Sequence, residues 1–272
     1  MIDLDRERQF YDTQYTQFLA LPDHALRIDR AVLEKNLDSP RHPFYERRRL
    51  YSAAIRALES AVGHGARVLD YGCGTADFGL WLATEGAQVT LLDLSPAAIE
   101  LGHRRAKASG VQVRGIAADA GQLGMLGDAE FDVVFASAAL HHTLKYPGAV
   151  EELARVMKSG AWLVLCETWG GNPMMNWARR VRARSAGEQE EQGEGIILYR
   201  GELQALDPHF KDVRVETMNL LAMGKRLLRG RFRSGWARGL VRTLEAADAV
   251  LLGVVPPLRE WCGEAVITAR RK

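Results

Sequence analysis

Glycines and acidic residues follow predicted strands at places where a chain could bind a nucleotide-like ligand. Residues 68–78 read Val-Leu-Asp-Tyr-Gly-Cys-Gly-Thr-Ala-Asp-Phe, an apolar run followed by a glycine turn and the start of a helix. Gly72 and Gly74 permit a tight turn and let the backbone approach a ligand with no side chain between. A dinucleotide-binding G-x-G-x-x-G would need a third glycine where this chain has Asp77, so a nicotinamide-dependent oxidoreductase is disfavoured.

A second acid, Asp93, closes the next predicted strand. It lies 19 residues after Gly74, near the ~20 residues at which a carboxylate meets ribose hydroxyls in such folds. Two vicinal hydroxyls suit the two oxygens of one carboxylate. The alternative is that Asp93 only caps the turn that follows it.

His141 and His142 follow the predicted fourth strand and are the candidate catalytic residues. Histidine changes charge near neutral pH, and a general base supplies about 10²–10⁴-fold in rate where an acceptor must lose a proton. The alternative is that the pair shapes a ligand pocket without taking part in chemistry. No third ligand stands at a suitable spacing, so we expect no metal site.

Strands and helices alternate from residue 66 onward, which predicts an α/β fold with a mostly parallel sheet and helices on both faces. The expected strands are Val68–Asp70, Val89–Asp93, Val113–Ala118, Phe131–Ser137, Trp162–Glu167, Val213–Met218 and Ala265–Ala269. One expected helix starts at the N-cap Ser95 with Pro96 and ends near Gly110. Another starts at Pro147 and closes at Gly160.

Three segments fall outside this alternation. We predict a helical N-terminal cap over residues 1–60, a core over 61–223, a helical insertion over 224–258 and a last core strand over 259–272. Within the core, residues 170–200 begin with the helix cap Asn172 and end in the glutamate-rich run Glu188–Glu194. Because ligands bind beyond the carboxyl ends of parallel strands, these additions are expected to form a lid and a substrate pocket.

The run Val68–Phe78 resembles motif I of the class I S-adenosylmethionine (SAM)-dependent methyltransferases. That family usually carries glycine where this chain has Ala76. Further runs that resemble family motifs are 93–96, 131–134, 138–143 and 151–160, and the strand 261–272 fits the family's last strand. Together the motifs cover about residues 66–168 in the expected order.

The resemblance implies a Rossmann-like sheet of seven strands, and SAM as the cofactor. It implies that Asp70 orients the glycine loop, that Asp119 accepts from the adenine amino group, and that Ser137 lies beneath the methionine part. The expected cofactor-binding set is Asp70, Gly72, Gly74, Thr75, Asp93, Leu94, Asp119, Ala120, Ser137 and Tyr11. In related enzymes an N-terminal helix closes over the cofactor, and a tyrosine there contacts the methionine carboxylate. For Tyr11, which shares a helix face with Tyr15, core packing is the alternative.

Composition sets limits on partners and location. A net charge of +2 implies no nucleic-acid partner, because a DNA-binding domain is usually far more basic. The cysteines Cys73, Cys166 and Cys262 match no zinc spacing and are expected to be reduced, buried thiols. With no signal-peptide pattern and no apolar run of ~18 residues, the chain is expected to be cytoplasmic.

A basic segment lies in the predicted insertion. Its basic and aromatic residues are Lys225, Arg226, Arg229, Arg231, Phe232, Arg233, Trp236, Arg238 and Arg242. Leu240, Leu244, Ala247 and Leu251 follow at helical spacing. Residues 225–258 could make peripheral membrane contact or grip an acidic substrate; the alternative is a solvated face over a packed stripe.

These features predict a methyltransferase that transfers the methyl group of SAM to an oxygen or nitrogen of a small organic molecule, such as a secondary metabolite, leaving S-adenosylhomocysteine. The Asn/Asp-Pro-Pro-Tyr motif of nucleic-acid-base amino methyltransferases and the paired-glutamate loop of protein-arginine methyltransferases are absent. One alternative is methylation of a membrane-associated lipid or isoprenoid, and another is a SAM-binding protein without transferase activity. The sequence leaves a homodimer open.

Overall fold

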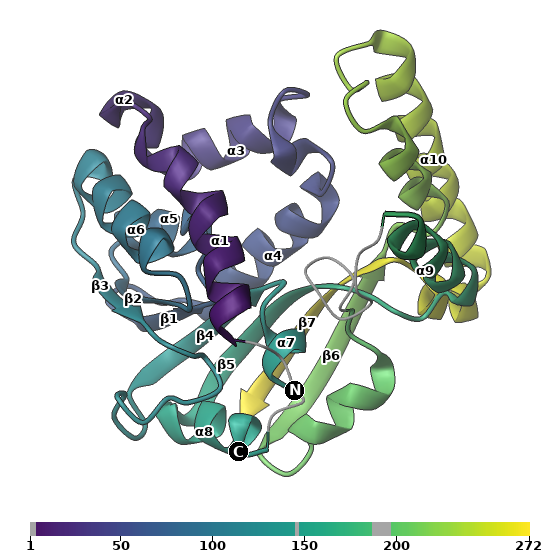
Figure 1. The fold of residues 1–272 in the computed structure, drawn as a ribbon. Helices are drawn as coiled ribbons and strands as arrows, with labels where there is room; N and C mark the ends of the chain where they lie inside the picture. The colour runs from purple at the N-terminus through teal and green to yellow at the C-terminus, as the bar shows by residue number, and fades with distance from the viewer. Residues whose placement is uncertain (1–3, 145–146, 187–196) are drawn as a thin grey trace.

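The computed structural model describes residues 4–144, 147–186 and 197–272 (Figure 1). Its centre is a seven-stranded sheet in the order β3-β2-β1-β4-β5-β7-β6, in which only β7 runs antiparallel to its neighbours. The strands are β1 (Arg67–Tyr71), β2 (Gln88–Asp93), β3 (Arg114–Ala117), β4 (Phe131–Ser137), β5 (Met157–Thr168), β6 (Phe210–Met218) and β7 (Glu264–Arg271). The predicted fold class is confirmed.

Helices cover both faces of the sheet and extend beyond it. The α-helices are α1 (Leu4–Leu19), α2 (Asp23–Leu26), α3 (Arg30–Asp38), α4 (Arg48–Ala61), α5 (Asp77–Thr84), α6 (Pro96–Ser109), α7 (Leu140–Thr143), α8 (Ala149–Val156), α9 (Pro173–Ala186) and α10 (Gly235–Val254). Short 3₁₀ helices are η1 (Pro43–Tyr45), η3 (Arg200–Leu206), η4 (Leu221–Leu228) and η5 (Pro256–Trp261). In Figure 1, α1 crosses in front of α6, and α10 rises on the opposite side of the molecule.

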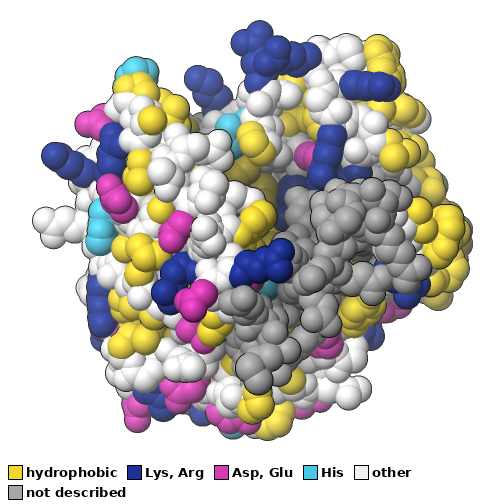
Figure 2. All heavy atoms as spheres, viewed as in Figure 1, with side chains coloured by type: hydrophobic (Ala, Val, Ile, Leu, Met, Phe, Trp, Pro, Cys, Tyr) yellow, Lys and Arg dark blue, Asp and Glu magenta, His cyan; other side chains and the backbone are white. Residues whose placement is uncertain are grey.

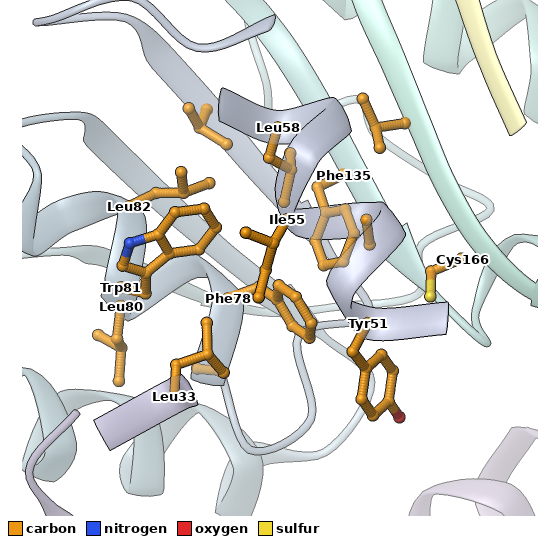
Figure 3. Close-up of a cluster of buried hydrophobic side chains, with 14 of the residues drawn as sticks. Leu33, Tyr51, Ile55, Leu58, Phe78, Leu80, Trp81, Leu82, Phe135 and Cys166 are labelled. Atoms are coloured by element: carbon orange, nitrogen blue, oxygen red, sulfur yellow. The ribbon is translucent and has the colours of Figure 1, made fainter. Parts of the chain in front are cut away.

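Alternation along the strands divides the core into two layers. Val68 of β1 packs in one cluster with residues of α3, α4 and α5, whereas its neighbour Leu69 packs in the other with residues of α8 and η3. Figure 3 shows the first layer, where Ile55 and Leu58 of α4 meet Phe135 of β4. Successive side chains of a strand point to opposite faces, so a strand buried on both faces is apolar throughout.

Local sequence signals set several boundaries as expected. The Ser95 side chain accepts a hydrogen bond from the Ala98 N–H (3.1 Å), Pro96 occupies the first turn of α6, and Gly110 ends it with φ +74°. The Asn172 side chain accepts from the Met175 N–H (3.1 Å) at the start of α9. These caps satisfy backbone groups that the helix ends leave without partners.

The predicted end of the helix after residue 147 was wrong. The helix α8 ends at Val156, and β5 begins at Met157, so Gly160 lies inside the strand with φ +77°. The register between β4 and β5 shifts at this place. A positive-φ glycine serves equally at a helix end and at a strand irregularity, so the glycine alone could not distinguish them.

The residues that α10 buries differ from the stripe of Leu240, Leu244, Ala247 and Leu251 that its helical spacing indicates. The buried residues are Ala237, Val241, Asp248 and Leu252, whereas Leu240 is 43% exposed. The Asp248 carboxylate is fully buried because it accepts from the backbone N–H groups of residues 220, 221 and 222 at the start of η4. The buried face of α10 therefore includes an acid whose carboxylate is satisfied by backbone N–H groups at the start of η4.

Lys225 does not belong to a solvated basic surface, contrary to the sequence-based interpretation. Its side chain is 1% exposed, and its Nζ lies 3.0 Å from the buried Glu264 carboxylate. The three cysteines are free and buried, as predicted. The run Glu188–Glu194 lies outside the described residues. Among the described helices, none has the length and apolar character needed to cross a bilayer.

Candidate active site

A cavity of about 340 Å³ lies at the carboxyl edge of the sheet, where β1 and β4 lie side by side and the strand order reverses. This is the edge at which open α/β sheets bind ligands. Its wall includes every residue of the predicted cofactor-binding set, namely Asp70, Gly72, Gly74, Thr75, Asp93, Leu94, Asp119, Ala120, Ser137 and Tyr11. The fold therefore brings together residues that lie up to 126 positions apart.

The glycine turn after β1 is tied to the end of β2 through Asp93. One Asp93 oxygen accepts from the Gly74 N–H (2.8 Å), and the other accepts from the Ser95 N–H (2.9 Å). Gly72 and Gly74 have φ +68° and +53°, conformations that favour glycine. Burial raises the pKa of Asp93, and the two N–H donors oppose this rise. Asp93 thus caps its own turn and still presents its carboxylate to the cavity.

Asp70 lies beneath the same turn. Its Oδ2 accepts from the Gly79 N–H at the start of α5 (3.1 Å), so it positions the helix that follows the glycine turn. Burial raises the pKa of Asp70 to about 7; the Gly79 hydrogen bond opposes the rise, and the nearby Asp93 and Asp77 carboxylates add to it. A carboxylate in this state can respond to any cation that enters the cavity.

Asp77 explains why the third glycine of a dinucleotide fingerprint is not needed here. Its carboxylate is 2.8 Å from the Arg105 guanidinium of α6 and accepts from the Thr75 hydroxyl (2.5 Å). The Arg105 guanidinium also donates to the Thr75 carbonyl. An ion pair between α5 and α6 thereby fixes the turn that the motif forms.

The loop after β3 is held from below by Tyr71. The Tyr71 hydroxyl donates to the Ala120 carbonyl (2.6 Å), and Asp119 accepts from the Gly121 N–H through Oδ1 (2.8 Å). Asp119 is half-buried and lines the cavity. It therefore forms a turn and also offers a carboxylate to a ligand.

Helix α1 closes one side of the cavity. Asp12 accepts from the Ser95 hydroxyl (2.5 Å) and from the Ala97 N–H (3.2 Å), which fixes α1 against the start of α6. This anchor places Tyr11 and Tyr15 on the cavity wall with their rings stacked, 6.1 Å between centroids. Burial raises the pKa of Tyr11 to about 12, so its hydroxyl stays a neutral donor.

The two histidines are in different environments. His142 lines the cavity, and its Nδ1 lies 3.0 Å from the Glu7 carboxylate of α1. His141 is instead buried, with its Nδ1 2.6 Å from Glu167 at the end of β5. Of the pair, His142 is therefore the residue placed to meet a ligand.

Aromatic rings line another part of the cavity. Phe44 lies 4.7 Å from Tyr51, and Phe78 lies 5.4 Å from Tyr51 and 4.9 Å from Phe135, measured between centroids. All four rings line the wall. These rings come from η1, α4, α5 and β4. The sequence alone indicated no pocket role for any of the four, because their positions are separated by up to 91 residues.

Arg47 is a half-buried cation on this aromatic wall. Its guanidinium donates to the Thr168 hydroxyl (3.0 Å), and its Nε lies 3.6 Å from Glu264. Glu264 also accepts from Lys225 and from Asn219. Burial would raise the pKa of Glu264, but Lys225 and Arg47 outweigh it and hold this pKa below its ordinary value. Two cations thus share one carboxylate, which leaves Arg47 suited to meet an electron-rich ligand group.

No group of His, Cys, Asp and Glu side chains among the described residues could hold a metal ion.

The cavity combines two kinds of surface. Acidic acceptors and backbone N–H groups suit a polar, nucleoside-like ligand, and the aromatic rings around Arg47 form an apolar pocket. Such a pocket can align an apolar acceptor and exclude water, which are the main requirements of transfer from an already electrophilic methyl group.

The fold and the site define a domain of known type. Residues 69–165 match the family model described as a methyltransferase domain. A solved structure of geranyl diphosphate C-methyltransferase from Streptomyces coelicolor has the same fold, with a TM-score of 0.57, 18% identity and coverage of 99% of this chain and 98% of that one. Residues 69–165 are therefore similar to methyltransferase domains, and the sheet around them has the fold of this solved methyltransferase.

Curated relatives include two demethylmenaquinone methyltransferases. The Mycobacterium marinum protein is 37% identical over 114 residues, which are 41% of this chain and 46% of the relative. The Thermus thermophilus protein is 32% identical over 136 residues, 47% of this chain and 61% of the relative. The chain thus spans about half the length of the relatives that it matches.

Proposed function

We propose that this protein transfers the methyl group of SAM to an oxygen or nitrogen of a small organic acceptor with an apolar or aromatic body. One observation carries the proposal. A single cavity joins the acidic and glycine-turn residues of a methyltransferase domain to the aromatic wall of Phe44, Tyr51, Phe78 and Phe135. Donor and acceptor would therefore lie in one water-poor space.

The chain's own residues take defined roles in this proposal. Asp93 accepts from the ribose hydroxyls, Asp119 from the adenine amino group, and the turn at Gly72 and Gly74 brings backbone close to the methionine part. Tyr11 donates to the methionine carboxylate. His142 is the candidate for acceptor contact or proton removal, and its Glu7 partner would stabilise the charged imidazole.

The test measures S-adenosylhomocysteine release from SAM with a panel of phenols, amines and isoprenoid quinols. We expect S-adenosylhomocysteine to be released with at least one acceptor, and not to be released when the enzyme is left out. Calorimetric binding of SAM with no release from any acceptor would instead support a SAM-binding protein without transferase activity. No heat with either SAM or S-adenosylhomocysteine would contradict the proposal altogether.

A membrane-associated isoprenoid quinone is the second candidate acceptor. The curated relatives carry the name demethylmenaquinone methyltransferase, and the aromatic wall suits a flat ring. Faster release with isoprenoid quinols than with small phenols would favour it, and the reverse order would count against it.

The affinity for SAM should depend on pH through Asp70. The pKa of Asp70 is about 7 without ligand, and a cationic cofactor lowers it, so binding should release a proton below pH 7. Affinity should rise as pH increases from 6 to 8, by at most about tenfold per unit below the pKa. Calorimetry in buffers of different ionisation enthalpy measures the proton. The Asp70→Asn variant should lose this pH dependence; its persistence would assign the proton elsewhere.

Arg47 should affect the acceptor more than the cofactor. Replacement of Arg47 by Met removes the cation of the aromatic wall, and we expect kcat/KM for the acceptor to fall about tenfold, a loss of ~1.4 kcal/mol. The affinity for SAM should not change. Arg48→Met is the matched control, because Arg48 pairs with Glu245 on α10 and is not part of the cavity wall. Equal losses in both variants would contradict the role of Arg47.

A further inference from the structure

Exposed apolar side chains are concentrated on one part of the surface. Of the 15 large hydrophobic side chains that the described residues expose, 12 lie between positions 174 and 261. The sheet core and the N-terminal helices contribute only three. Apolar side chains that share one exposed face can mark an interaction site.

Helix α10 carries the clearest part of this surface. Trp236, Leu240, Val250 and Val254 are between 43% and 75% exposed. Positions 236, 240, 243, 247, 250 and 254 are spaced alternately by four and three residues, so they share one helix face. We name the four exposed side chains the α10 stripe. The opposite flank of the helix already packs on the protein through Ala237, Val241, Asp248 and Leu252. Within the part of the chain that the structure describes, the stripe is thus a second, exposed apolar face.

The segment around the α10 stripe is predominantly basic. Residues 221–261 hold eight of the chain's 36 basic residues and only three of its 34 acidic residues. Some of these charges are already paired inside the protein. Asp248 caps η4 and Glu245 pairs with Arg48, while the buried Lys225 pairs with Glu264 and Arg229 pairs with Glu46. Arg231 and Arg233 are exposed just before α10, and Arg242 is exposed on it. Figure 2 shows hydrophobic side chains along the edge where α10 lies, with basic side chains nearby.

We infer that the α10 stripe, with Arg231, Arg233 and Arg242, docks on the surface of an anionic lipid bilayer. A helix with tryptophan and aliphatic side chains on one face and arginines beside it lies in the headgroup region, and anionic lipids attract each arginine. A second copy of this chain is the poorer occupant, because a two-fold contact would bring the same basic surfaces together.

The docking surface is connected to the cavity. Phe232, just before α10, packs against Tyr45 with 5.4 Å between ring centroids, and the neighbouring Phe44 lines the cavity. The Arg48–Glu245 ion pair (2.5 Å) joins α10 to α4. Docking would therefore hold the acceptor end of the cavity near the lipid. This purpose rests on the proposed function, whereas the docking itself does not.

Co-sedimentation tests the inference without methyl donor or acceptor. The full chain should pellet with vesicles of phosphatidylcholine containing phosphatidylglycerol, and not with phosphatidylcholine alone. The single variant Trp236→Ala and the double variant Arg231→Glu/Arg233→Glu should each bind these vesicles about tenfold more weakly, or weaker still. High salt should weaken the binding of the unaltered chain to the same vesicles. Lys35→Glu/Lys107→Glu is the matched control: it makes the same change in net charge at exposed sites on α3 and α6 and should bind normally.

Three results would overturn the inference. They are absence of binding to anionic vesicles, equal losses in the control double variant, and self-association that Trp236→Ala abolishes in sedimentation without lipid. Calorimetry with S-adenosylhomocysteine distinguishes failure of the docking inference from failure of the proposed function. The docking variants should bind that ligand normally, so loss of lipid binding leaves the methyl-transfer proposal standing.

Discussion

Replacement of Asp93 by Ala should lower the affinity for SAM and for S-adenosylhomocysteine by about 10–100-fold, the cost of losing hydrogen bonds to a charged group. The carboxylate accepts from Gly74 and Ser95 and also faces the cavity, so its removal loosens the glycine turn and deletes the proposed ribose acceptor. Calorimetry measures the loss. Asp128→Ala, an exposed acid whose carboxylate pairs with Arg155, is the control and should bind normally.

A ligand pair separates the two roles of Asp93. In the unaltered protein, removing both ribose hydroxyls from S-adenosylhomocysteine should weaken binding strongly, whereas in Asp93→Ala it should matter little. Asp93→Asn keeps an acceptor oxygen for the turn and loses the charge. Its affinity for S-adenosylhomocysteine should therefore lie between those of the unaltered protein and Asp93→Ala. If the dideoxy ligand loses as much affinity in Asp93→Ala as in the unaltered protein, Asp93 only caps its turn.

Replacement of Glu264 by Leu should lower the free energy of unfolding by about 3–5 kcal/mol, the range for removing one partner of a buried ion pair. Glu264 is fully buried, 3.0 Å from the Lys225 Nζ and 2.5 Å from the Asn219 Nδ2. Without it, the buried Lys225 and the half-buried Arg47 would lose their shared counter-ion. Lys225→Met should cost less, because Arg47 still neutralises the carboxylate. Denaturant unfolding compares the variants.

The same carboxylate should give the protein an acid-sensitive stability. Because the pKa of Glu264 is lowered in the folded state, its contribution is present above the ordinary value of 4.5 and is lost as pH falls through the lowered pKa. The Glu264→Gln variant, which keeps the shape of the side chain, should show a weaker loss of stability over this acidic range. Equal unfolding free energies for Glu264→Leu and Lys225→Met would show that the two cations do not share Glu264 as described.

The sheet and the cofactor edge could be predicted because their signals are local. An apolar run that ends in a glycine turn indicates a buried strand, and parallel strands end at one edge of a sheet. Asp70, Asp93 and Asp119 could therefore be assigned to one cavity without knowledge of any contact between them. The same locality explains the confirmed caps at Ser95 and Gly110.

The acceptor end of the site could not be predicted, because long-range packing assembles it. Phe44, Arg47 and Tyr51 come from the N-terminal helices, and Phe135 from β4. The periodicity of a helix states which residues share a face but not which cavity that face meets. His141 and His142 show the same limit, because their different partners, Glu167 and Glu7, come from distant parts of the chain.

The sequence by itself determined the strand pattern, the glycine turn and the acids that follow the strands, since each depends on neighbours within a few residues. Only the tertiary structure decided that Lys225 is buried beside Glu264 and that the α10 stripe is exposed. The physical reason is that burial of a charge or of a helix face depends on counter-charges and caps far away in the chain, here Glu264 for Lys225 and η4 for Asp248.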